Sequence, residues 1–89
     1  MYVIKSTADD KVSFLESFTI ERKFEALNIC ASWGPFSDYL AIVLYAAIFE
    51  KAECAATLIA LIGFLGGDVS KLEVVALDDL IDWTVAENE

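Results

Sequence analysis

The stretch from Asp38 to Gly66 constrains the fold more than any other part of this sequence. Between these two residues the only charged side chains are Glu50, Lys51 and Glu53, and there is no proline. One unbroken helix over residues 38–65 would be about 42 Å long, whereas a chain of this length forms a globule roughly 31 Å across. We therefore expect a break near Glu50 that gives a helical hairpin, or else a protruding helix that another chain covers.

The N-terminal region has the alternating pattern of β-strands. Residues 2–4 are rich in strand-forming side chains, and over residues 12–20 apolar and polar residues alternate, with Glu16 as the exception. This pattern predicts a β-hairpin that turns at residues 8–11. A helix from Ser13 is the alternative, because Ser13 and Glu16 match a capping box. On a helical wheel its apolar residues would fall on two opposed faces, which favours strands.

Helical spacing begins after this hairpin. Apolar residues at positions 20, 24, 27 and 31 predict an amphipathic helix that ends near Trp33-Gly34-Pro35. We expect Ser37 to cap the next helix, with Asp38 in its first turn, and Gly66-Gly67 to end the apolar helix.

The C-terminal part is less decided. Residues 72–77 fit either a short strand or a helical turn, and residues 78–85 predict a final helix. The expected fold is thus a single domain over residues 1–89, of the α+β class and mostly helical. It would consist of an N-terminal β-hairpin followed by about four helices, with a very apolar central helix or helical hairpin at residues 38–65.

The central apolar segment is a candidate interface. A helix that is apolar all round must be buried all round, either inside the monomer or against a second copy of the chain. Small side chains four residues apart would also let another helix approach closely. The candidate homodimer interface consists of Tyr39, Ile42, Tyr45, Phe49, Ala52, Ala56 and Ala60.

Acidic residues gather near the C-terminus. Of the net charge of −9, six negative charges fall in residues 68–89, which hold seven acids and one base. Carboxylates spaced along a helix could present a phosphate-like stripe to a basic groove on a protein partner. The alternative is an N-cap at Asp78 and otherwise solvated charges. The candidate partner-binding residues are Glu73, Asp78, Asp79, Asp82, Trp83 and Glu87.

Several function classes have little support. The sequence has no histidine and none of the common nucleotide-binding, hydrolase or metal-binding motifs, so we expect no enzyme, cofactor or metal. A pI near 4.2 opposes direct binding to nucleic acid or to an anionic membrane. The two cysteines, Cys30 and Cys54, lack metal or disulfide spacing, so we expect two buried, unreactive thiols in a reducing compartment. No secretory signal is evident at the start, so we expect a cytoplasmic protein.

In size, acidity and lack of catalytic motifs, the chain resembles small inhibitor proteins of phages and mobile elements, such as anti-CRISPR and anti-restriction proteins. The resemblance implies a non-enzymatic protein that binds and inhibits a protein partner by nucleic-acid mimicry. The alternative is a structural or assembly protein that forms a helical homo-oligomer through residues 38–65.

Overall fold

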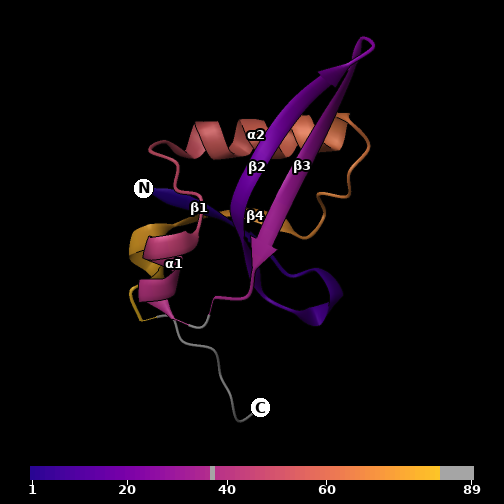
Figure 1. The fold of residues 1–89 in the computed structure, drawn as a ribbon. Coiled ribbons are helices and arrows are strands. Elements are labelled where there is room, and N and C mark those ends of the chain that lie inside the picture. The colour runs from indigo at the N-terminus through magenta and orange to yellow at the C-terminus, as the bar shows by residue number, and fades with distance from the viewer. Residues whose placement is uncertain (37, 83–89) are drawn as a thin grey trace.

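The protein forms a four-stranded antiparallel sheet with helices on both faces, in a computed structural model that describes residues 1–36 and 38–82 (Figure 1). The strands lie in the order β3-β2-β1-β4. They are β1 (Tyr2–Ser6), β2 (Ser13–Lys23), β3 (Ala26–Gly34) and β4 (Leu72–Ala76), and the α-helices are α1 (Tyr39–Tyr45) and α2 (Ala52–Phe64). Two short 3-10 turns complete the described elements, η1 (Ala8–Asp10) and η2 (Leu77–Leu80).

The expectation of a mostly helical fold is wrong. The described residues form two α-helices rather than about four, and strands dominate. The N-terminal β-hairpin is present, since β1 and β2 pair antiparallel through Lys5–Phe14 and Ser6–Ser13. The next segment is where the expectation fails, because β2 does not end near Ile20 but continues to Lys23.

The segment expected to form a helix from Ile20 to near Trp33 is instead part of a second β-hairpin. A two-residue turn at Phe24 and Glu25, both with positive φ (49° and 69°), joins β2 to β3. The pairing runs without a gap from Lys23–Ala26 to Ser17–Ser32. The apolar residues of this segment fit two patterns, a helical spacing and an alternation at every second position of β3. Pairing with β2 stabilises the strand, so the alternating pattern is the one that forms.

The apolar segment 38–65 is broken, but it does not form a packed helical hairpin. The chain between α1 and α2 is not helical, and residues 47–49 enter the sheet where β1 and β2 diverge. Ala47 N–H donates to the Leu15 carbonyl at 2.8 Å, and Phe49 and Tyr2 exchange two backbone hydrogen bonds of 2.8 Å each. The chain thereby passes through the plane of the sheet, so that α1 lies on one face and α2 on the other.

Two hydrophobic clusters result, one on each face of the sheet. The α1 face buries Val3, Phe14, Ile42, Leu77 and Leu80, and the α2 face buries Ile4, Leu15, Ala55 and Leu58. Side chains of consecutive strand residues point to opposite faces. The adjacent apolar pairs Val3-Ile4 and Phe14-Leu15 therefore supply both clusters at once.

A β-bulge at Glu16 keeps the second hairpin apolar on the α2 face. The register of β2 against β3 shifts between Leu15 and Ser17, which leaves Glu16 as the extra residue. Because of this insertion, Phe18 lies on the same face as Leu15 and packs against the cluster under α2. Its ring stacks on Phe49 with the ring centroids 6.2 Å apart.

The start of α1 and the end of α2, which bound segment 38–65, have clear local causes. Asp38, rather than Ser37, caps α1, since its Oδ1 accepts a hydrogen bond from Ala41 N–H at 2.9 Å; Ser37 lies outside the described residues. At the other end, α2 ends at Phe64 as the glycine pair predicted. Gly66 has φ +94° and donates to the Gly63 carbonyl, and Gly67 donates to the Ile62 carbonyl at 2.9 Å, which together form a Schellman motif.

Of the two alternatives at residues 72–77 the strand is the one that forms, and the final helix is not found in the described residues. Residues 72–76 form strand β4, which pairs with the whole of β1. The α-helix expected over residues 78–85 is not present in the part that the structure describes, where η2 ends at Leu80 and a turn follows at Ile81 and Asp82. Residues 83–85 lie outside that part.

The Schellman motif gives a first prediction. Gly66→Ala should lower the free energy of unfolding by about 1 kcal/mol, because alanine does not readily adopt a positive φ. Gly63→Ala is the matched control within the same helix. A Cβ there would meet only the Val69 side chain, at 3.4 Å, so this variant should be neutral or stabilising. Urea unfolding of both variants tests the assignment, which is wrong if Gly66→Ala is as stable as the original.

Candidate functional site

The candidate partner-binding residues that the structure describes follow one another along edge strand β4, η2 and the turn after it. We call Glu73, Asp78, Asp79 and Asp82 the acidic edge; all four are exposed. Between Leu72 and Asp82 the sequence contains no basic residue. Trp83 and Glu87 lie outside the described residues. The acidic edge therefore rests on four carboxylates from β4, η2 and the turn that follows.

Buried leucines hold the middle of the acidic edge in place. Asp78 and Asp79 lie between Leu77 and Leu80, which are only 8% and 5% exposed and belong to the cluster on the α1 face. Leu77 N–H also donates to the Met1 carbonyl at 2.8 Å. Because the two leucines anchor η2, the two carboxylates extend into solvent from a fixed backbone.

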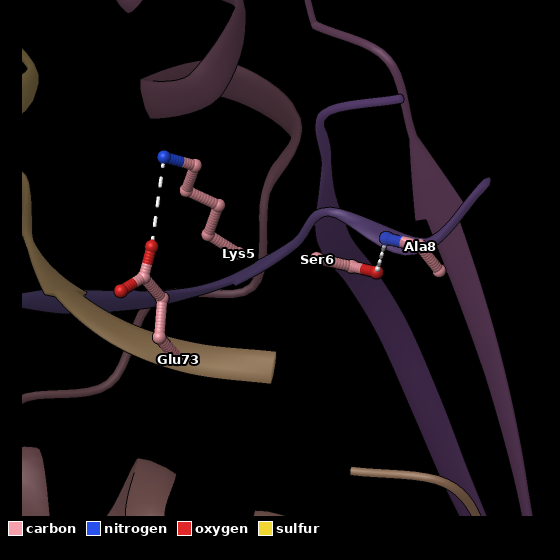
Figure 2. Close-up of polar contacts among 4 residues, drawn as sticks. All are labelled: Lys5, Ser6, Ala8 and Glu73. Atoms are coloured by element: carbon pink, nitrogen blue, oxygen red, sulfur yellow. Dashed lines mark hydrogen bonds and ion pairs between the residues drawn. The ribbon is translucent and has the colours of Figure 1, made fainter. Parts of the chain in front are cut away.

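Glu73 is the one member of the acidic edge with a charged partner among the described residues. Its Oε1 lies 3.5 Å from Nζ of Lys5 on the neighbouring strand β1 (Figure 2). The Glu73 side chain is 58% exposed, so solvent screens this pair and it adds little stability. Its effect on the surface is to offset one of the four negative charges.

The seven candidate dimer residues of segment 38–65 do not form one surface. Ile42 is fully buried in the cluster on the α1 face and Tyr39 packs against that cluster, whereas Phe49 packs against the cluster on the α2 face. Of the others, Ala52 is half-buried, and the structure exposes Tyr45, Ala56 and Ala60. Exposed members therefore lie on α1 and on α2, which cover opposite faces of the sheet.

An open groove of about 830 Å³ lies on the α2 face of the second hairpin. Its floor is apolar and includes Leu27, Ile29 and Trp33 of β3, with Ile62 and Leu65 from the end of α2. Charged residues stand around it, namely Asp9, Lys11 and Asp68. The sequence does not predict this groove, because the residues of β3 that form its floor fit a helical spacing.

Local hydrogen bonds shape the two polar walls of the groove. On one side, the buried Ser6 Oγ accepts from Ala8 N–H at 3.3 Å, at the entry to η1 (Figure 2). On the other side, Asp68 Oδ1 accepts from Ser70 N–H at 2.9 Å and from Ser70 Oγ at 2.7 Å. The backbone and side-chain hydrogen bonds from Ser70, followed by the nearby Lys71 charge, hold the pKa of Asp68 below its ordinary value of 3.8.

The described residues contain no group of three or more metal-ligating side chains. No helix in residues 1–36 and 38–82 has the length and apolar character to span a membrane. Cys30 on β3 and Cys54 on α2 are both exposed as free thiols, so the expectation that they are buried is wrong. Comparison with protein-family models, with curated proteins and with solved structures finds no match for this chain.

The lowered pKa of Asp68 gives a second prediction, with a defined pH dependence. A carboxylate whose folded pKa lies below its unfolded value stabilises the fold above the unfolded pKa of 3.8, and this contribution is lost as the pH falls through the folded pKa. Asp68→Asn should therefore be less stable than the original protein at neutral pH, and the difference should disappear at strongly acidic pH. Urea unfolding across this range measures it.

Ser70→Ala supplies the control for this prediction. It removes the Oγ donor but keeps the backbone donor, so it should reproduce part of the Asp68→Asn effect. The double variant should be no less stable than Asp68→Asn alone, because the two groups share one interaction. Additive losses, or a difference that persists in acid, would show that the carboxylate does not act through Ser70.

Proposed function

We propose that this protein is a non-enzymatic inhibitor that binds a basic, nucleic-acid-binding groove of another protein through its acidic edge. The observation that supports the proposal is the placement of Asp78 and Asp79. A short turn anchored by two buried leucines presents both carboxylates to solvent, directly after edge strand β4. The complement of such a surface is a row of lysine and arginine side chains, the kind that holds phosphates.

Carboxylates held on a fixed backbone are better suited to binding a partner than carboxylates on a mobile chain, which serve only solubility. Carboxylates on a mobile tail would lose side-chain and backbone entropy when they bind, whereas η2 has already fixed the backbone of its acids. The charge is also unevenly placed, since residues 1–37 carry five acids and four bases. Long-range attraction to a basic groove would therefore orient the β4 edge toward the partner during association.

Neutralising the acidic edge tests the proposal. We expect Asp78→Asn/Asp79→Asn/Asp82→Asn to lose on the order of tenfold or more in affinity for the partner, because three attractive charges disappear. The partner is captured from a lysate of the source organism with immobilised protein and identified by mass spectrometry. It should be a nucleic-acid-binding protein, and excess double-stranded DNA or RNA should displace it from the original protein.

The matched control is Asp9→Asn/Asp10→Asn/Glu16→Gln, which removes the same number of charges from exposed positions away from the acidic edge. Asparagine tolerates the positive φ of Asp9 and Asp10. This control should keep the partner. Equal losses in both variants would mean that net charge alone governs binding, and full retention by the first variant would refute the assignment of the surface.

A homo-oligomer through residues 38–65 is the second candidate function, and exposed apolar side chains on α1 favour it. Leu40 and Leu44 lie one helical turn apart and are 63% and 62% exposed. Association through this face would be apolar, so added salt should not weaken it. Leu44→Glu should then abolish self-association in sedimentation experiments at any ionic strength; an assembly that survives this change does not use α1.

A further inference from the structure

The outer edge of β3 has none of the features that usually keep a sheet edge from pairing. Over nine residues, Ala26–Gly34, the strand contains no charged residue and no proline. The opposite edge strand, β4, has five residues and carries Glu73 with Lys71 directly before it. Soluble proteins protect their edges with short strands, charges, prolines or covering loops. Strand β4 is protected in this way and β3 is not.

The pairing with β2 determines which backbone groups of β3 face outward. Lys23 and Ala26 flank the two-residue turn and form the first hydrogen-bonded pair of the antiparallel ladder. The alternation then directs the backbone groups of Asn28, Cys30 and Ser32 toward β2. Those of Leu27, Ile29, Ala31 and Trp33 point away from the sheet, and within the described residues they have no backbone hydrogen-bond partner.

The far part of this hairpin lacks the support that a two-stranded ribbon needs. Beyond the bulge, β2 pairs only with β3, because β1 reaches it only at Ser13 and Phe14. Every residue from 19 to 28 is exposed, and the hairpin tip extends past α2 (Figure 1). An isolated two-stranded hairpin is marginal in water, and a third strand with an apolar face is what stabilises it.

We propose that β3 pairs antiparallel with β3 of a second copy of this chain, so that the two sheets join into one eight-stranded sheet. A two-fold axis through Cys30 gives the register that uses all four outward-facing residues. In it Leu27 pairs with Trp33 of the second copy and Ile29 pairs with its Ala31. The proposal concerns a different edge of the sheet from the proposed inhibitory function and does not depend on it.

Charge determines which edge of the sheet a second copy can occupy. A chain of net charge −9 repels itself, so copies can associate only where their acids stay apart. The strand order places β3 and β4 at opposite ends of the sheet. Pairing through β3 would therefore leave the two acidic edges at the two far ends of the joined sheet, where mutual repulsion is weakest.

The same register accounts for Phe24 at the hairpin tip. This side chain is fully exposed and has a positive φ of 49°, a conformation that is rare for a bulky residue. Continued past Trp33, the pairing brings the tip of one copy toward Pro35 and Phe36 of the second. Phe24 would then bury apolar surface that the monomer leaves in water.

Cysteine cross-linking tests the proposal, because the two exposed thiols report on different surfaces. At the two-fold axis, Cys30 and its copy form a non-hydrogen-bonded pair with Cα atoms about 4.5 Å apart, within the range for a disulfide. Under mild oxidation with copper–phenanthroline, Cys54→Ser, which keeps Cys30, should form a covalent dimer on a non-reducing gel. Cys30→Ser, which keeps the exposed Cys54 on α2, should run as a monomer on the same gel, because no thiol lies at the proposed two-fold axis.

A second pair of variants tests the non-covalent association. Sedimentation of the reduced protein should give twice the monomer mass of 9.8 kDa. Ala31→Lys, which places a charge on the β3 edge, should shift the protein to monomer, and Ala60→Lys, the same change on the exposed face of α2, should not. Both residues are exposed, and far-UV circular dichroism would confirm that each variant folds.

The results distinguish a dimer that pairs through β3 from one that associates through the helices. A Cys30 dimer that is lost in Ala31→Lys supports pairing through β3. Cross-linking through Cys54, or a dimer that is lost in Ala60→Lys and kept in Ala31→Lys, would overturn the proposal in favour of an interface on the helices. A monomer at every accessible concentration would overturn it as well.

Discussion

Three backbone hydrogen bonds at Ala47 and Phe49 decide how the rest of the chain can pack. Strands β1 and β2 diverge after their second pair, which would leave backbone donors and acceptors of both strands unpaired inside the protein. Residues 47–49 fill this gap, with Leu15 as the partner on one side and Tyr2 on the other. The helix of the apolar segment stops at this point, because the backbone groups of residues 47–49 form hydrogen bonds with the sheet instead.

The sheet's two-sided burial follows from that insertion. Once the chain passes through the plane of the sheet, α1 covers one face and α2 the other, and the central strands must present apolar side chains in both directions. The adjacent pairs Val3-Ile4 and Phe14-Leu15 meet this requirement. An alternating pattern with one polar face would have left one of the helices without a surface to cover.

The sequence predicted those features that short-range chemistry determines. The first hairpin, the break in segment 38–65 and the end of α2 at the glycine pair could be read from alternation, from length and from the φ freedom of Gly66. Exposure of the acids at positions 73, 78, 79 and 82 was also accessible, since unpaired carboxylates are rarely buried. The composition, by contrast, gave no information on the partner of any strand.

The errors arose where a long-range contact decides between two local patterns. Residues 20–31 fit a helical spacing and a period of two equally well, and neither asparagine-glycine nor any other usual turn dipeptide marks the turn at Phe24-Glu25. Residues 77–80 fit a helix start, but the burial of both Leu77 and Leu80 and the bond to the Met1 carbonyl hold them in a 3-10 turn. Tertiary contacts override local propensity in both places.

The two edges of the sheet differ in kind, and this difference links the fold to its possible partners. Strand β4 is short and pairs along its whole length with β1, and acids follow it in η2, so it offers charge to a partner. Strand β3 is long and uncharged, so it offers backbone hydrogen bonds. Because two strands separate these edges, occupation of one leaves the other accessible. Under the two proposals, a single sheet assembles through hydrogen bonds at one end and recognises a basic surface at the other, with the buried β1–β2 centre between the two edges.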